Sequence, residues 1–273
     1  MELYAWVTPA FIPRISPVDH TWVTTYDSRE TVYQNIGEVL AANEHHWFSW
    51  GKFHKEGNPR DFPGGLLFQT TAPPDKSLCL VTPDDPKLGR GTIRWYGIHG
   101  VCHQLSNQIL YPAQKSVHFA RGYPLSSAIY GTFGRRNRAW NERRTACQIA
   151  PVSMTASTRT ASLLKTRVIT LLKADANEPI VVAIEQQREE LLKAIEDIGY
   201  AVKSPDETKE QRVESINKRI NEFLDGIFVT LRGNSTHYVS LFKIEPGVRI
   251  DLVDPELFEF PDQEAINDWH AGN

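Results

Sequence analysis

The feature that most constrains the fold of this chain is a change in its hydrophobic periodicity. Residues 20–26 alternate aromatic and β-branched side chains with the two-residue period of a strand. Residues 181–198 and 210–224 instead repeat apolar side chains every three or four positions, as amphipathic helices do. A chain that contains both patterns is expected to form an α+β fold, with an antiparallel sheet and a separate set of helices.

Short strand-like and helix-like runs fill the rest of the sequence and are separated by Pro and Gly turns. Strands are predicted at 3–8, 20–26, 45–51, 66–70, 78–81, 92–98, 228–232 and 236–244. Helices are predicted at about 28–43, 101–110, 156–174, 181–198 and 210–224.

Strand-like patterns return after residue 225. Their return determines how the helical region before them is interpreted. Residues 151–225 are expected to be a helical region inserted between core strands of a single α+β domain that spans residues 1–273. The centre of this region is a long charged helical hairpin, interrupted by the polar run Lys203–Thr208. A structural brace is the favoured interpretation of the hairpin, and docking of a partner protein is the alternative.

The composition is that of a globular protein and excludes several functional classes. The chain has 273 residues, of which 41% are hydrophobic and 23% are charged. Its net charge of −3 offers no basic excess for nucleic acid or for an anionic membrane. No apolar run approaches the roughly 20 residues of a membrane span, and the first residues lack the basic region of a signal peptide. These features predict a cytoplasmic protein, while signal-independent export stays open.

The three cysteines, Cys79, Cys102 and Cys147, are far apart and form no Cys-x-x-Cys pair. Such an odd, sparse set predicts neither a disulfide framework nor a zinc ribbon, and it favours a reducing compartment. Cys79 lies between two leucines and is interpreted as core packing. Cys147 follows an arginine-rich stretch with no obvious helix start.

Cys102 has a different context, because it heads the helix-like run 101–110 directly after Gly100 and Val101. The free N–H groups and the dipole of a helix N-terminus favour a thiolate. His20 opens a strand-like run, from which an imidazole can supply a base and later an acid. The pair predicts a cysteine nucleophile served by a histidine. The oxyanion donor is expected to be the N–H of Cys102, with the side chains of Tyr96, Gln104 and Asn107 as further candidates.

Two short runs resemble the sequence signatures of papain-like enzymes. Asp19-His20-Thr21-Trp22-Val23 is similar to the strand that the catalytic histidine begins, and Phe48-Ser49-Trp50-Gly51 is similar to the Asn-Ser-Trp-Gly signature of the next strand. The histidine here precedes the cysteine, which resembles the circularly permuted papain-like group of lecithin–retinol acyltransferase-like proteins and NlpC-type peptidases. The resemblance covers roughly residues 1–135 and implies an antiparallel sheet packed on the cysteine helix.

The chain departs from this family at the group that orients the base. The asparagine of the signature is replaced by Phe48, whose ring cannot orient an imidazole. His46 shares the strand face of Phe48, and a second histidine is the orienting group in the acyltransferase-like relatives. The predicted catalytic residues are therefore Cys102, His20 and His46. Weaker candidates for the orienting role are Ser49, Asp27 and His45, and a surface pair at a strand edge is the alternative interpretation of the two adjacent histidines.

Two other clusters are less informative. His99, His103 and His118 could together bind zinc, but no His-Glu-x-x-His motif is present, so no metal and no cofactor are predicted. The basic cluster around Trp140 is interpreted as a solvated face; it consists of Arg135, Arg136, Arg138, Arg143 and Arg144.

These observations predict a cysteine-dependent hydrolase that cleaves an amide in a peptide, an isopeptide or a cell-wall peptide through a thioester acyl-enzyme. The expected partner is a peptide or acyl-amide substrate. Two alternatives stay open: an acyltransferase that uses the same Cys-His site, and a catalytically inactive protein that binds a partner through the helical hairpin.

Overall fold

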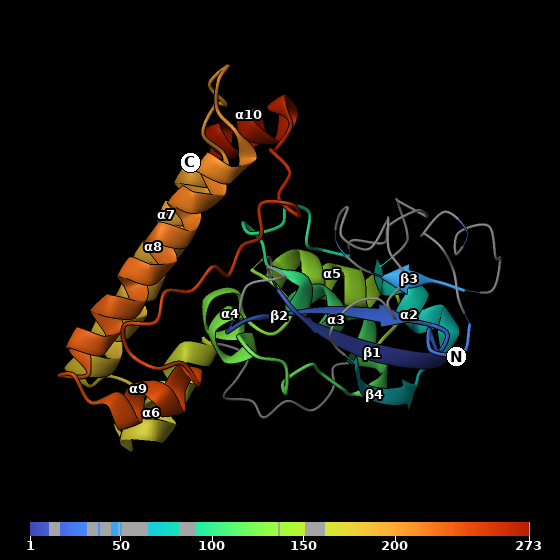
Figure 1. The fold of residues 1–273 in the computed structure, drawn as a ribbon, viewed down its shortest axis with the longest axis horizontal. Coiled ribbons are helices and arrows are strands. Elements are labelled where there is room, and N and C mark those ends of the chain that lie inside the picture. The colour runs from blue at the N-terminus through green and yellow to red at the C-terminus, as the bar shows by residue number, and fades with distance from the viewer. Residues whose placement is uncertain are drawn as a thin grey trace.

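The computed structural model describes residues 1–10, 17–31, 38, 45–48, 50, 65–81, 91–135, 137–150 and 162–272. Over these residues the chain is an α+β protein with a four-stranded antiparallel sheet, as its periodicity predicted. Figure 1 shows the sheet at one side of the molecule and a long helical hairpin at the other. Of the helix predicted at about 28–43, residues 28–31 form a turn and a bend, residue 38 is helical, and residues 32–37 and 39–43 lie outside the described residues.

The sheet is built by the N-terminal part of the chain. Its order is β3-β2-β1-β4, with β1 at Glu2–Pro9, β2 at Asp19–Thr24, β3 at Trp47–Phe48 and β4 at Gly65–Thr71. These elements confirm the strands predicted at 3–8, 20–26 and 66–70. Of the strand predicted at 45–51, only the two residues of β3 are paired within the part of the chain described.

Alternation along the central strands separates two apolar clusters. Leu3, Ala5 and Val23 face the main core, whereas Trp6 and Trp22 belong to a second aromatic cluster. Trp6 and Trp22 are register partners across β1 and β2, and their rings stack with centroids 6.5 Å apart. Every residue of β2 is buried, so this strand has protein on both faces.

The helices that follow the sheet correct two strand predictions. Residues 78–81 belong to helix α2 (Pro74–Val81), which begins at a proline and buries Ser77 and Leu80, three positions apart. Residues 92–98 form turns, with Gly91 and Gly97 at positive φ, and share only an isolated bridge between Tyr96 and Gly100. The further helices here are α3 (Cys102–Leu110), the 3-10 turn η3 (Tyr111–Ala113), α4 (Tyr123–Tyr130), α5 (Asn137–Ala146) and α6 (Leu163–Leu172).

The hairpin consists of α7 (Pro179–Gly199) and α8 (Lys209–Thr230), which confirms its two predicted helices. The polar run between them forms the tip, where buried Arg212 pairs with Glu207 and also donates to the carbonyl of Ile198. Figure 1 shows α10 (Gln263–Gly272) at the tip and α6 and α9 (Ser235–Phe242) at the other end.

The strands predicted at 228–232 and 236–244 are helical instead. The first run continues the buried stripe of α8 through Leu224, Ile227 and Leu231, so the helical register outweighs its strand-like composition. The second forms α9, whose first turn is capped by the Asn234 side chain, which accepts the His237 N–H at 2.9 Å. Within the described residues no strand follows β4, so the hairpin is not inserted between strands.

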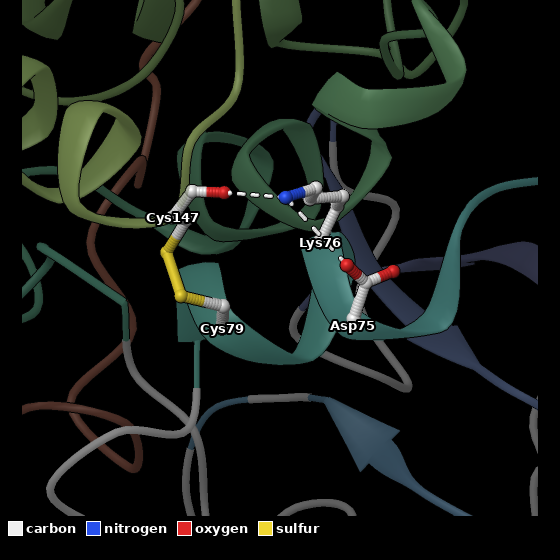
Figure 2. The surroundings of a disulfide bond; sticks show 4 residues. All are labelled: Asp75, Lys76, Cys79 and Cys147. Carbon is white, nitrogen blue, oxygen red and sulfur yellow. Dashed lines mark hydrogen bonds and ion pairs between the residues drawn. A yellow bond between two sulfur atoms is a disulfide. The ribbon is translucent and has the colours of Figure 1, made fainter.

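A disulfide corrects the interpretation of two cysteines. Cys79 of α2 is bonded to Cys147, which directly follows α5, across 68 residues of sequence (Figure 2). Lys76 lies beside the bond, and its Nζ donates to the carbonyl of Cys147 at 3.0 Å and pairs with Asp75 at 3.6 Å. Sequence spacing missed the bond because only the packing of α2 brings the two residues together. Disulfides persist mainly in oxidising compartments, so this bond argues against the predicted reducing compartment; the cytoplasmic location remains a prediction.

Among the described residues, the structure has no helix that is both long enough and apolar enough to cross a membrane.

Candidate active site

Cys102 is the first residue of α3, as its context predicted. Val101 before it is extended, at φ −125° and ψ −171°, and its N–H donates to the side-chain Oε1 of Gln104 at 3.0 Å, which closes the first turn. All nine residues of α3 are buried, and the helix packs against β2. The thiol therefore belongs to the N-terminal residue of α3, a position at which the helix dipole and free N–H groups favour negative charge.

His20 lies on β2, paired with Thr8 of β1, and is only 2% exposed. Its Nε2 lies 2.9 Å from Oδ2 of Asp254, a residue that is 5% exposed and 234 positions later in the sequence. The side chain of Cys102 acts on the same ring and raises its pKa. The Cys102 sulfur itself lies 3.9 Å from the carbonyl oxygen of Asp19, the residue before His20. The structure thus aligns a thiol, an imidazole and a carboxylate.

The charge state of His20 follows from these partners. Burial alone would lower the pKa of the ring, because it removes water from the charged form. The hydrogen bonds to Asp254 and Cys102, together with the negative charges of both, outweigh burial and raise the pKa of His20 to about 10. His20 is therefore an imidazolium at neutral pH, held between two acidic groups.

Tyr96 lies beside the same groups, as one of the three candidate oxyanion donors. Burial raises the pKa of its phenol well above 10, and the charges of Cys102 and Asp254 add to this. The backbone of Asp254 acts in the opposite direction and offsets part of this rise. The phenol therefore stays protonated and can donate a hydrogen bond near the sulfur. Trp50, from the predicted signature, meets the Tyr96 ring edge-on with centroids 5.6 Å apart.

The other two candidate donors have structural roles. Gln104 closes the first turn of α3 and donates through Nε2 to the carbonyl of Gly131 at 3.1 Å. Asn107 donates to the carbonyl of Thr132 at 2.8 Å and accepts the N–H of Val117 at 2.9 Å. Both amides are occupied in holding the loops around α3.

His46 does not lie at the site, which corrects the predicted orienting residue. Its N–H donates to Oγ1 of Thr25 at 2.8 Å, so His46 lies beside the residue that directly follows β2, five positions from His20 in the sequence. At about 3.3 Å per residue, this places it roughly 16 Å from His20. Its ring instead stacks on Phe48, with centroids 5.6 Å apart. Burial, with a smaller contribution from the charge of His45, lowers the pKa of His46.

The weaker orienting candidates have other neighbours too. The ring of His45 stacks on Tyr26, with centroids 4.9 Å apart, and Asp27 forms a salt bridge with Arg29 at 2.5 Å. Ser49 lies outside the described residues.

The orienting residue that sequence reasoning missed is Asp254. It lies in the Asp- and Pro-rich tail, whose composition is typical of turns. One signal was available: the preceding run Ile250-Asp251-Leu252-Val253 is largely apolar, and three of its residues are buried. A carboxylate that directly follows buried residues is a candidate for a buried partner.

The three histidines considered for zinc do not converge. His103 Nδ1 lies 2.8 Å from Oγ of Ser126, His99 Nε2 lies 2.8 Å from the hydroxyl of Tyr200, and His118 is exposed. Burial, with a smaller contribution from the charge of His20, lowers the pKa of His103 to about 3, so this ring is neutral. Within the described residues no group of three or more His, Cys, Asp or Glu side chains is arranged to hold a metal ion.

Comparisons with protein-family models, with curated proteins and with solved structures find no match to this chain.

Proposed function

We propose that this chain is a cysteine-dependent hydrolase that cleaves an amide through a thioester acyl-enzyme at Cys102. The observation that carries the proposal is the position of His20, whose Nε2 lies 2.9 Å from Oδ2 of Asp254, while the side chain of Cys102 acts on the same ring and raises its pKa. A nucleophile, an acid–base group and an orienting group in this order are what acyl transfer through a side chain requires.

The proposed reaction has two steps, formation of the acyl-enzyme and its hydrolysis, and His20 acts as an acid in the first and as a base in the second. The Cys102 sulfur attacks the amide carbonyl carbon, and the charge that develops on the oxygen is stabilised by the Cys102 N–H and the Tyr96 hydroxyl. The carbon–nitrogen bond breaks as the His20 imidazolium gives its proton to the leaving amine. Water then attacks the thioester, His20 accepts a proton from it, and the carbon–sulfur bond breaks to release the acid. Asp254 keeps the ring oriented and its charge balanced throughout.

The papain-like architecture belongs to the proposal as well. Its support is an antiparallel sheet with α3 packed on β2, and a histidine strand that precedes the cysteine helix in the chain. The orienting group differs from the papain pattern, because it comes from the C-terminal segment and not from the strand next to β2. A permuted papain-like core with its own source of carboxylate is therefore the fold that we propose.

An acyltransferase at the same site is the second candidate, and burial favours it. Cys102 is 5% exposed and His20 is 2% exposed. A site that excludes water protects a thioester from hydrolysis, so an amine or alcohol acceptor could replace water. An inactive protein that binds a partner through the hairpin stays a prediction without a specific observation in its favour.

A generic acyl donor tests the chemistry without knowledge of the substrate. We expect p-nitrophenyl acetate to produce a burst of nitrophenolate and to add one acetyl group to Cys102, detected by intact mass and peptide mapping. The matched controls are Cys102→Ala and Cys102→Ser. Acetylation elsewhere, or an equal burst in Cys102→Ala, would overturn the proposal.

The acceptor is then identified from products. A peptide library is incubated with the protein with and without glycinamide, and the products are identified by mass spectrometry. New carboxyl termini in both samples support a hydrolase, whereas products that carry glycinamide support an acyltransferase.

A further inference from the structure

The segment that carries Asp254 is tied to the hairpin by two asparagines of α8. The Nδ2 of Asn217 donates to the carbonyl of Val253 at 2.8 Å, and its Oδ1 accepts the N–H of Val253 at 2.9 Å. Asn221 binds Ile250 in the same way, with both distances 2.8 Å. Each side chain therefore satisfies the N–H and the C=O of one residue, as a neighbouring strand would.

The spacing of the two asparagines matches the segment they hold. They are four residues apart, so they lie on the same face of α8 one turn from each other. Asn217 is 3% exposed, and a buried amide without partners would be unfavourable. Both polar atoms of its side-chain amide bond to Val253, the residue directly before Asp254. This makes the contact a clamp on the backbone next to the carboxylate.

The opposite side of Val253 is fixed as well. Gly97 has φ +80°, and a Cβ at that position would lie 2.6 Å from Cγ1 of Val253. The backbone turn that precedes α3 therefore presses against the segment from the side of the site. Val253 is held between this turn and α8, and it cannot shift without breaking one of the two contacts.

The carboxylate itself is used on both oxygens. Oδ1 of Asp254 accepts the N–H of Glu256 at 2.9 Å, and Oδ2 faces His20 Nε2 at 2.9 Å. Its direction is therefore set by its own backbone, and that backbone is set by the clamp. A small rotation of the segment would move Oδ2 out of hydrogen-bonding range of His20.

We propose that Asn217 and Asn221 are positioning residues, which hold residues 250–253 on α8 so that Asp254 reaches His20. This inference rests on the proposed function, because it gives the hairpin a part in the Cys102 site. The titratable groups that act on His20 or on which it acts are Asp254 from this segment and Cys102 and His103 from α3. Asp19, next to His20 on β2, is paired with Arg121. Tyr96 faces Cys102 and Asp254.

The test uses alkylation of the intact chain by iodoacetamide without reductant. Cys79 and Cys147 stay bonded under these conditions, so Cys102 is the one free thiol. We expect Asp254→Asn to slow alkylation at pH 6 by about tenfold or more, the factor that corresponds to one pKa unit of lost imidazolium stabilisation. At pH 9 the alkylation rates of the native chain and of Asp254→Asn should differ less, because a thiol without a charged partner also ionises at that pH.

The asparagine variants are compared with that result. The pH dependence of Cys102 alkylation in Asn217→Ala should approach that in Asp254→Asn. In Asn221→Ala it should differ less from that of the native chain, because Ile250 is four residues from the carboxylate. Gln187→Ala is the matched control: it removes an amide that bonds Thr230 at 2.7 Å within the hairpin and does not touch residues 250–254. This control should keep the native profile.

The outcomes separate the inference from the function beneath it. Folded Asn217→Ala and Asn221→Ala with the native profile would overturn the inference alone. A native chain no faster at pH 6 than Asp254→Asn and His20→Ala would overturn the proposed function. If an alanine variant does not fold, Asn217→Asp replaces it. This change keeps the acceptor for the Val253 N–H and loses the donor to its carbonyl, so an intermediate profile supports the inference and a native one overturns it.

Discussion

Replacing Asp254 by asparagine is the most direct perturbation of the site. The substitution keeps the size of the side chain and one carbonyl oxygen, and it removes the negative charge 2.9 Å from His20. The neighbouring Glu256 N–H keeps an acceptor. The variant therefore isolates the charge of the orienting group from its volume.

The magnitude follows from the raised pKa of His20. A rise from 6.5 to about 10 corresponds to roughly 5 kcal/mol of preference for the protonated ring, shared between Asp254 and Cys102 and already reduced by burial. Removing one partner of a buried ion pair costs about 3–5 kcal/mol. Asparagine keeps a hydrogen-bonding group, so we expect a loss of about 2–4 kcal/mol in the free energy of unfolding at pH 6.

The pH dependence has a definite sign. His20 has a raised pKa in the folded chain, so its stabilising contribution is complete below pH 6.5 and is lost as the pH rises to about 10. The difference in free energy of unfolding between the native chain and Asp254→Asn should therefore shrink from pH 6 to pH 10.

Urea unfolding, followed by circular dichroism at pH 6, 8 and 10, measures this difference. Glu207→Gln is the control, because Glu207 pairs with buried Arg212 and this hydrogen bond lowers the pKa of Glu207, which keeps its carboxylate ionised over this range. Its cost should not change with pH. A cost of Asp254→Asn below about 1 kcal/mol at pH 6, or equal costs at pH 6 and pH 10, would refute the assignment of a charged His20–Asp254 pair.

Three other variants test the nucleophile, the excluded histidine and the disulfide. Cys102→Ser should lose acetylation by p-nitrophenyl acetate and keep the native circular dichroism spectrum, because a hydroxyl is far less acidic than a thiol; a native burst would exclude the sulfur as nucleophile. His46→Ala should change the alkylation rate of Cys102 less than about twofold, given its roughly 16 Å separation from His20, and a loss as large as that of His20→Ala would restore it to the site. Replacing both Cys79 and Cys147 by alanine should lower the free energy of unfolding by roughly 4 kcal/mol on the chain-entropy model for 68 residues of separation, and a urea midpoint equal to that of the native chain would contradict this value.

The sequence was sufficient for the features that depend on neighbouring residues. The alternation at 20–26 places His20 on a strand, and Gly100-Val101 before Cys102 marks the start of a helix. The stripe of Val213, Ile216, Ile220 and Leu224 defines α8. These patterns are local, because strand and helix periodicity is set by side chains that lie within a few positions of each other.

Short apolar runs were ambiguous for the same reason. Residues 78–81, 228–232 and 236–244 have strand-forming side chains, yet each is helical. Packing of Leu80, Leu231 and Tyr238 against the core decides their form, and a run of four to nine residues is too short for its own periodicity to compete with that packing.

The carboxylate partner of His20 and the disulfide were decided by tertiary structure. The orienting carboxylate is 234 residues from His20, and the disulfide joins residues 68 apart. No periodicity extends over such distances, because these pairs form only when α8 holds the C-terminal segment and when α2, packed on α3, brings Cys79 to Cys147. His46 was predicted from the strand face that it shares with Phe48 and from the second histidine of the acyltransferase-like relatives. Asp254 bonds His20 instead, because a buried imidazolium is stable only beside an anionic partner and the fold brings one from the far end of the sequence.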